Sequence, residues 1–433
     1  MKNNIIYQLA LRSFTPEGTL SAAAKLLGHV AALGADIVYV CPFFKEDDDS
    51  EMSAWSERQL ASHTDNPKNP YKIADYFAVD NEYGTEADLL EFTKTAHKNG
   101  LKVMFDLVYL HCGRNAVFIK DNPEFVVRNS DGSVTVADRW PFARLNFESR
   151  GLREYLIKNM ETLMCDYGAD CFRCDVGDSV PLDFWGEAFG RLKKINHELI
   201  TLNEGIKSEY IKDVFDMCYD FDWNTLLVGI FSEREPAEKI RSLYEKEKEI
   251  YGAGTGKLIR TIETHDTASD CGLKRNEIIM TPRGVEAALV VTNTFEGVPF
   301  LWNGYEFCDN AENNMFSNRF HGRRSVINWS RAFTADGKRR LEFIKNIHHL
   351  RHESAALCEG DTQWIENSEP QKLISYSRNT EGERIIIIVN TRNEAVEASI
   401  GAELADLQIL MESGVKIGDR ISAEPYGYVI AKL

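Results

Sequence analysis

The sequence predicts an α/β fold: a (β/α)8 TIM barrel with a short inserted excursion after its third strand, followed by a C-terminal antiparallel β domain. Two patterns within the 433 residues support this prediction. Eight strand-like apolar runs alternate with segments whose apolar residues recur every three or four positions, as far as Arg351. Beyond that point short β-rich runs are separated by Asn, Gly and Glu residues. We therefore expect a barrel over residues 1–352, which includes a reduced inserted subdomain over 112–149, and a β-sandwich-like domain over 353–433.

The runs expected to form the barrel strands are short and apolar, and they lie at 5–11, 36–43, 102–109, 171–175, 199–204, 216–221, 257–264 and 299–303. Helical periodicity separates most of them, at 20–33, 86–99, 152–166 and 285–294. Repeated strand-then-helix units give parallel strands with right-handed crossovers, and eight such units close a barrel. In the tail, we expect antiparallel pairing of the runs 373–377, 384–390, 395–400, 407–411 and 427–431.

Two connections are too long for simple turns, and both follow a strand, on the side where a barrel places its ligand site. The first, 45–72, is polar, and we expect its acidic run 46–49 to be a solvated loop rather than a cation site. The second, 112–149, carries the turn Asn129-Ser130-Asp131-Gly132 between β-branched runs. This second pattern predicts a small hairpin.

Charge and hydropathy exclude two classes of partner. Acidic residues outnumber basic ones by 17, and no block of Lys or Arg occurs along the chain. We therefore expect no nucleic-acid partner. No apolar run approaches 18 residues, so we expect no membrane span or anchor. The oligomeric state is left open by these patterns.

Nine cysteines are scattered, mostly within apolar segments, which is typical of small buried side chains in a reducing compartment. Cys171 and Cys174 form a C-x-x-C, but no second pair follows, and we expect neither a metal nor another cofactor. The first strand-like run starts almost at Met1, which leaves no room for a signal peptide. These observations predict a cytoplasmic protein.

Charged and polar residues gather where four of the expected strands end. The carboxyl ends of barrel strands meet at one rim, and polar residues there are typical of a catalytic site. An isolated arginine–aspartate pair is most often a structural ion pair, but four strands that converge on one rim favour a shared function. The residues concerned are Asp106, His111, Arg173, Asp175, Glu204, His265 and Asp266.

Two carboxylates on either side of a bond suit glycoside hydrolysis, in which one attacks as an anion and the other releases the leaving oxygen as an acid. Asp175 fits the first role because Arg173, two residues earlier on the same strand, favours its charge. Glu204 fits the second role because it ends an apolar strand with no cation beside it in the sequence. Asp266 would stabilise positive charge on the sugar, and His111 and His265 can donate to hydroxyls.

These motifs resemble those of the α-amylase superfamily of glycoside hydrolases. The matching segments include D-x-V-x-x-H at 106–111, F-R-x-D at 172–175, N-E-G at 203–205 and T-H-D at 264–266. Further matches extend from Ile6-Tyr7-Gln8 to Gly304-Tyr305-Glu306. The resemblance implies a (β/α)8 barrel with a C-terminal β domain, and an enzyme that retains the anomeric configuration.

Carried over position by position, the resemblance implies Asp175 as the nucleophile, Glu204 as the acid/base and Asp266 as the transition-state stabiliser. Arg173 would hold Asp175, and Asp106 would be a structural partner of the arginine. Tyr71 would stack on the sugar ring on the non-reducing side of the cut, where His111 and His265 would bind hydroxyls.

Two departures from the family pattern qualify this implication. Leu110 stands where the family usually has an asparagine that binds calcium, so we expect no metal site there. The segment 176–180 lacks the Lys-His pair of classical α-amylases, which leaves endo or exo action open.

The resulting prediction is hydrolysis of α-glucosidic bonds, most simply α-1,4 bonds, in an oligosaccharide or α-glucan substrate. The alternatives are a transglycosylase or α-glucosidase with the same machinery, or a non-catalytic carbohydrate-binding relative. The presence of all three carboxylates argues against the non-catalytic alternative.

Overall fold

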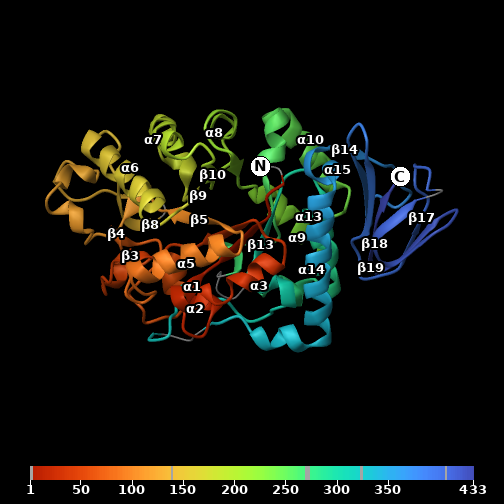
Figure 1. Cartoon of the computed structure of the whole chain (residues 1–433), viewed down its shortest axis with the longest axis horizontal. Coiled ribbons are helices and arrows are strands. Elements are labelled where there is room, and N and C mark those ends of the chain that lie inside the picture. Colours follow the sequence, from red (N-terminus) through yellow and green to blue (C-terminus); the bar gives the residue numbers. More distant parts are fainter. Residues whose placement is uncertain (1–2, 138–139, 269–273, 322–324, 405–406) are drawn as a thin grey trace.

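The computed structural model describes residues 3–137, 140–268, 274–321, 325–404 and 407–433. Its centre is a parallel sheet whose eight described strands follow the order β11-β10-β9-β5-β2-β1-β13-β12 (Figure 1). A parallel bridge between Cys218 and Leu258 links the two ends of this order. The predicted (β/α)8 barrel is confirmed, with strands β1 (Ile6–Leu9), β2 (Ile37–Val40), β5 (Lys102–Leu107), β9 (Cys171–Cys174), β10 (Ile200–Asn203), β11 (Met217–Cys218), β12 (Ile259–Arg260) and β13 (Val298–Trp302).

Alternation along the strands divides the core in two. Ile37 and Tyr39 of β2 belong to a cluster inside the barrel, whereas Val38 and Val40 pack outward against the helices. The main covering helices are α2 (Leu20–Ala24), α3 (Leu27–Ala32), α5 (Glu86–Lys98), α6 (Arg150–Cys165), α7 (Leu182–Ile195), α8 (Ser208–Asp213), α9 (Phe221–Phe231), α10 (Lys239–Tyr251), α13 (Thr281–Thr294) and α14 (Ala335–Glu353).

Local sequence explains where such helices begin. In α5, the Thr85 hydroxyl accepts from the Asp88 backbone N–H, and the Asp88 carboxylate accepts from the Thr85 N–H, which makes a reciprocal cap. Leu89, Phe92 and Ala96 then bury one face of the helix against the barrel. Helix α6 begins in a similar way, with the Ser149 hydroxyl accepting from a backbone N–H of its first turn.

Both long connections carry small antiparallel sheets. The second contains β6 (His111–Cys112), β7 (Val136–Ala137) and β8 (Trp140–Arg144), in the order β6-β8-β7. The hairpin predicted within it is present, because the Gly132 N–H donates to Asn129 O and Arg128 bridges Val134. At the two ends of the first lie β3 (Phe44–Glu46) and β4 (Ile73–Val79), which pair with each other although the polar sequence between them did not indicate it.

The C-terminal part is an antiparallel sheet at one end of the molecule (Figure 1). Its strands are β14 (Asp361–Trp364), β15 (Leu373–Asn379), β16 (Arg384–Asn390), β17 (Val396–Ala398), β18 (Gln408–Ile417) and β19 (Ile421–Lys432). The sheet was expected, although β14 was not. Helix α14 passes through the expected boundary between residues 352 and 353, so the exact division stays a prediction.

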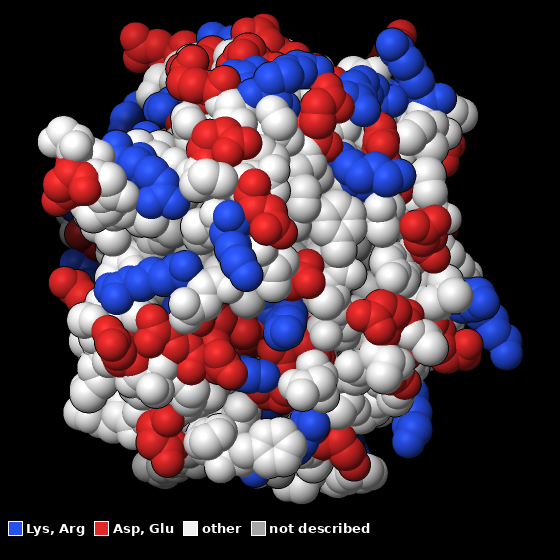
Figure 2. Space-filling view, turned by 90° about the vertical axis from the view of Figure 1, so that its left-hand side faces the viewer, with Lys and Arg blue, Asp and Glu red and all other residues white. Residues whose placement is uncertain are grey.

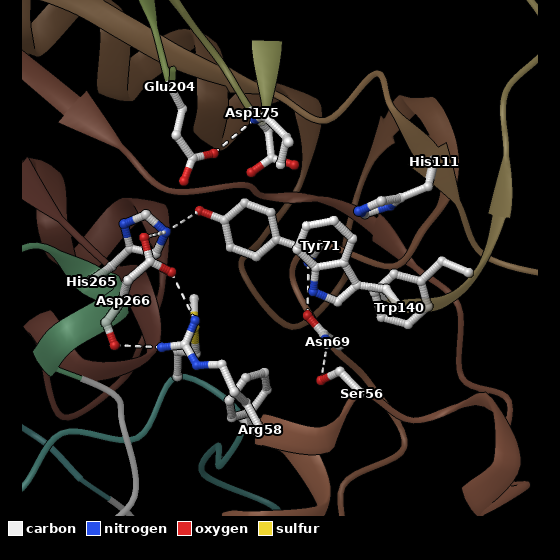
Figure 3. Close-up of a pocket in the computed structure, with 14 residues that line it drawn as sticks. Ser56, Arg58, Asn69, Tyr71, His111, Trp140, Asp175, Glu204, His265 and Asp266 are labelled. Carbon is white, nitrogen blue, oxygen red and sulfur yellow. Dashed lines mark hydrogen bonds and ion pairs between the residues drawn. The ribbon is translucent and has the colours of Figure 1, made fainter. Parts of the chain in front are cut away.

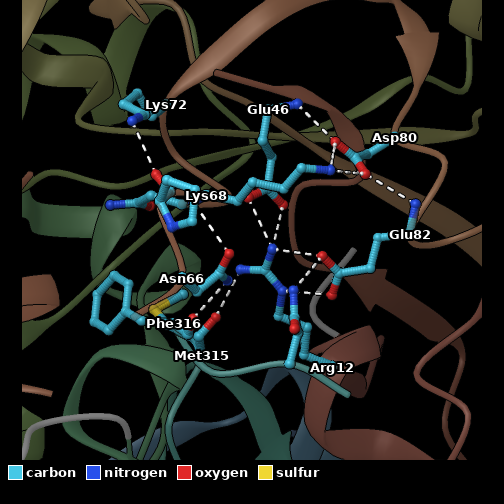
Figure 4. A network of polar contacts seen from close by, with 12 residues as sticks. Arg12, Glu46, Asn66, Lys68, Lys72, Asp80, Glu82, Met315 and Phe316 are labelled. Carbon is cyan, nitrogen blue, oxygen red and sulfur yellow. Dashed lines mark hydrogen bonds and ion pairs between the residues drawn. The ribbon is translucent and has the colours of Figure 1, made fainter. Parts of the chain in front are cut away.

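A buried arginine ties the first long connection, the segment after β4 and the segment after β13 to the start of the barrel (Figure 4). Arg12, just after β1, donates to Glu46 Oε2 at 2.9 Å, to Glu82 Oε1 at 2.8 Å and to Met315 O at 2.9 Å. Asn66 donates from its side chain to Phe316 O at 2.8 Å. The expectation of a solvated acidic run at 46–49 is therefore wrong for its first residues. Glu46 is buried because Arg12 compensates its charge.

Within the described ranges, none of the helices is both long and apolar enough to cross a bilayer. On the face seen in Figure 2, lysine and arginine side chains lie apart from one another, interspersed with acidic and uncharged residues.

Candidate active site

Asp175 and Glu204 follow neighbouring barrel strands at the same level. Strand β9 ends at Cys174 and β10 ends at Asn203, and these two residues are register partners. Neighbouring strands lie about 4.8 Å apart, so the next residues, Asp175 and Glu204, start side by side. The predicted convergence of these two acids on one rim is therefore present in the structure.

Arg173 is the fully buried cation that the acids of this rim share. Its Nη1 lies 2.7 Å from Asp106 Oδ1 and 2.8 Å from Asp175 Oδ1, and its Nη2 lies 2.7 Å from Glu204 Oε2. The contacts to the two aspartates are hydrogen bonds. Sequence separation hid the contact to Glu204, so the view that this acid has no cation beside it needs correction. Glu204 also accepts from the Val176 backbone N–H at 2.7 Å.

The protonation of the two acids follows from their burial. Burial raises the pKa of Glu204 to about 7, although Arg173 opposes this rise. Burial also raises the pKa of Asp175 well above its usual value, with Arg173 opposing and the charge of Glu204 adding to the rise. The pair therefore holds a shared proton near neutral pH. The aligned hydrogen bond from Arg173 to Asp175 favours leaving that proton on Glu204.

Asp266 has a different environment, in the first turn of the short helix α11 (His265–Ala268). Arg58 Nη1 donates to Asp266 Oδ1 at 2.7 Å, and its Nη2 donates to the Asp266 carbonyl. Burial opposes ionisation, but His265, Arg58 and Arg173 together lower the pKa of Asp266 to about 2. Asp266 is consequently a permanent anion in this pocket.

A hydrogen-bond chain fixes the orientation of His265. Gln8 accepts from the His265 backbone N–H through Oε1, so its amide nitrogen, 2.8 Å from His265 Nδ1, must donate. Burial lowers the pKa of His265 to about 4, so the neutral ring carries its proton on Nε2. That N–H faces the Tyr71 oxygen at 2.7 Å, and the Tyr71 hydroxyl donates to Asp106 Oδ2 at 3.0 Å.

Tyr71 and His111 both line the inner cavity. The Tyr71 ring is stacked on His265, with ring centroids 5.4 Å apart. His111 lies against the rings of Trp140 and Phe142, and burial lowers its pKa to about 3. Its buried Nδ1 has no hydrogen-bond partner among the described residues.

These side chains enclose an inner cavity of about 70 Å3 (Figure 3). It adjoins a wider outer cavity of about 760 Å3, and Trp140, Val176, Glu204 and Asp266 line both. Six of the seven predicted site residues line the inner cavity, and the seventh, Arg173, lies beneath them. Val176, directly after Asp175, also lines this cavity. Sequence reasoning missed the remaining residues of its wall, Ser56, Arg58, Asn69, Trp140, Phe142, Met315 and Phe316.

The missed residues come from the long connections and from the segment after β13, whose paths the sequence does not indicate. Gln8 was also missed as a partner of His265. Its only signal was a polar residue within an otherwise apolar first strand.

Leu110 stands where the family that the motifs resemble usually has a calcium-binding asparagine. Leu110 is buried and presents no oxygen from its side chain. In the parts of the chain that are described, no group of three or more His, Cys, Asp or Glu residues is placed to hold a metal ion.

Comparison with known proteins gives consistent matches. The family model for the catalytic domain of alpha-amylase matches residues 4–131. The chain is 25% identical over 422 residues to Alpha-amylase MalA of Haloarcula japonica, which covers 93% of this chain and 57% of that protein. It is 22% identical over 443 residues to an Alpha-1,4-glucan:maltose-1-phosphate maltosyltransferase of Picrophilus torridus, and this alignment covers 97% of this chain and 66% of that protein. The chain thus spans less than two thirds of the length of these curated relatives.

A solved structure supports the same fold over the whole chain. The noncanonic maltogenic alpha-amylase AmyB from Thermotoga neapolitana superimposes with a TM-score of 0.83 and 21% sequence identity. The superposition covers 100% of this chain and 99% of that one. The likeness concerns the barrel together with the C-terminal sheet.

Proposed function

We propose that the chain belongs to the α-amylase superfamily and that it is a retaining α-glycosidase acting on maltooligosaccharides or related α-glucans. Its bonds of choice would be α-1,4-glucosidic. The observation that carries the proposal is the set of three carboxylates, Asp175, Glu204 and Asp266, around one sugar-sized hollow, each in a different electrostatic environment.

In the first step, the ionised Asp175 would attack the anomeric carbon while Glu204 gives its proton to the departing glycosidic oxygen. The pKa of Glu204, raised to about 7, suits an acid that works near neutral pH. Asp266, ionised at any physiological pH, would stabilise the positive charge that develops on the ring. Arg173 would hold Asp175 in position.

In the second step, the ionised Glu204 would take a proton from an incoming hydroxyl, whose oxygen bonds to the anomeric carbon. The bond to Asp175 then breaks, and the configuration of the substrate is restored. Both acids contact the one guanidinium of Arg173, so their carboxyl groups lie close together, and this arrangement suits direct attack better than a water held between the two acids.

Neutral hydrogen-bonding groups would hold the sugar ring. His265 is fixed in one tautomer by Gln8 and Tyr71. His111 lines the same cavity, and burial keeps its ring neutral. Tyr71 would offer the edge or face of its ring to the sugar, although its stacking on His265 limits the face that remains free.

A specific observation favours a second candidate, transfer to a sugar hydroxyl. The wide outer cavity beside Glu204 could admit an acceptor sugar in place of water. The similarity to a maltosyltransferase is consistent with this alternative. Product analysis at high maltooligosaccharide concentration distinguishes the two, since transfer yields products longer than the substrate.

The free thiols of the eight described cysteines that carry no disulfide favour a reducing location. We infer a cytoplasmic setting on this basis, and fractionation of cells that express the tagged chain tests it.

The decisive experiment measures maltooligosaccharide hydrolysis together with the anomeric configuration of the first product by NMR. Asp175→Asn and Glu204→Gln should each lower turnover by about 10²–10⁴-fold or more and leave the fold intact. Asp183→Asn, an exposed aspartate on α7, is the matched control and should retain activity. Comparable turnover in either site variant, or inversion of configuration, would contradict the proposal.

A further inference from the structure

Arg58 is held in the wall of the inner cavity by a rigid helical turn. It lies in α4 (Glu57–Ala61), where the Ser56 hydroxyl accepts from the Gln59 N–H at 3.2 Å. Gln59 is fully buried, and its amide donates to Asn66 O at 2.9 Å. The turn is thus fixed from beneath, and Arg58 projects from it toward Asp266 (Figure 3).

The contact between Arg58 and Asp266 faces the cavity rather than the core. About a third of each side chain is exposed, 35% for Arg58 and 34% for Asp266. A buried structural pair in this molecule, such as Arg173 with Asp106, is instead fully enclosed. A substrate in the cavity would therefore meet the Arg58 guanidinium directly.

The positions of the two cavities indicate where each end of a bound substrate would lie. Glu204 lines both cavities, whereas Arg58 lines only the inner one, together with Met315 and Phe316. In Figure 3, Arg58 lies on the far side of Asp266 from Glu204. Because the acid must protonate the leaving oxygen, the leaving group would exit toward the outer cavity on the side of Glu204. The part of the substrate on the non-reducing side of the cut, the glycone, would extend toward Arg58.

The available space differs about tenfold between these directions. The inner cavity measures about 70 Å3 and the outer one about 760 Å3. A single water needs about 10–15 Å3 of cavity volume, so the inner cavity has room for roughly half a dozen waters. A long glycone would have to displace Arg58, which is tied to both the side chain and the carbonyl of Asp266.

We propose that Arg58 closes the glycone side of the cavity, so that the protein removes units of only one or two sugars from the non-reducing end. The guanidinium would donate to hydroxyls of the terminal ring, and Met315 and Phe316 would complete the barrier. Arg58 is thus a residue that determines product length, and this role rests on the proposed glycosidase function.

The test uses maltoheptaose with a fluorescent label at its reducing end, and separates early products by chromatography. The wild-type protein should release unlabelled glucose or maltose and leave labelled chains that are one or two units shorter. Arg58→Ala should raise the early share of unlabelled products with three or more units at least fivefold. Its KM for maltotriose should rise by more than its kcat falls. Arg150→Ala, which removes an exposed ion-paired arginine on α6, is the matched control with an unchanged pattern.

Different results overturn different parts of the account. Hydrolysis by both proteins with the same product lengths would refute the role of Arg58 alone, as would interior cutting by the wild-type protein. Absence of hydrolysis of any α-glucan by the wild-type protein would refute the proposed function and with it this inference. If Arg58→Ala is inactive, Arg58→Lys decides, because it keeps the charge near Asp266 but shortens the barrier. Longer products from that variant support the proposal, and unchanged products overturn it.

Discussion

Replacing Glu204 with glutamine should stabilise the protein in alkaline solution while it removes activity. Burial raises the pKa of Glu204 from 4.5 to about 7, so the folded protein holds this proton at a pH where the unfolded chain has lost it. Between these values the unfolded state binds fewer protons, and stability therefore falls as the pH rises. The loss of unfolding free energy that comes from ionising the buried Glu204 is absent below about pH 4.5 and complete above about pH 7. Glutamine has the shape of the protonated acid and escapes the cost.

The magnitude follows from the difference in pKa. A difference of about 2.5 corresponds to about 3 kcal/mol of unfolding free energy. The opposing attraction of Arg173 is already contained in the raised pKa, and the side chain is only 15% exposed, so solvent screening reduces the figure little. Loss of the Glu204 charge also lowers the pKa of Asp175, which acts in the same direction.

The assay is urea unfolding of the wild-type protein and of Glu204→Gln, followed by tryptophan fluorescence at about pH 5 and about pH 8.5. The variant should gain about 3 kcal/mol over the wild-type protein at the higher pH and about 1 kcal/mol or less at the lower one. Glu198→Gln, an exposed residue shortly before the same strand, should change stability by less than about 0.5 kcal/mol at both. A variant less stable than wild type at high pH, or an equal difference at both pH values, would refute the reasoning.

Three further predictions concern the surroundings of the acids. Arg173→Met should lower the free energy of unfolding by about 3–5 kcal/mol, because three buried carboxylates lose their shared cation; a loss below about 1 kcal/mol in urea unfolding would contradict this. Gln8→Leu should lower kcat/KM by about tenfold without unfolding the barrel, since His265 loses the hydrogen bond that sets its tautomer; unchanged kinetics would refute that role. Dialysis against a chelator should leave the melting temperature unchanged, because no group of three or more His, Cys, Asp or Glu among the described residues is placed to hold a metal ion. A drop in melting temperature that calcium restores would contradict this expectation.

The barrel was predictable because its strands and helices carry distinct periodicities. All eight expected runs contain a barrel strand, with ends shifted by a few residues, since apolar runs continue past the last ladder hydrogen bond. Strands β3 and β14 were missed because neither has a continuous apolar run. Strand β3 pairs with β4 across the first long connection, and β14 pairs with the next strand, β15; such pairing leaves little trace in a short polar segment.

The candidate site was predictable as far as it lies on strand ends. Asp175 and Glu204 end adjacent strands, and barrel geometry alone brings them together. Arg58 was not predictable, because it reaches Asp266 across 208 positions from a polar connection. The contact of Arg173 with Glu204 was hidden for a similar reason, since the length and direction of a buried guanidinium decide which neighbours it serves.

The Arg12 cluster has a consequence for how this chain can vary. One guanidinium neutralises acids contributed by β3 and by the segment after β4, and it also anchors the backbone at Met315. Transplanting only the segment with Arg12, only that with Glu46 or only that with Glu82 from a homologue that lacks the cluster would leave a buried charge without its counterpart. We expect the three to be inherited or engineered only as a matched set, which makes the cluster a constraint on recombination between relatives.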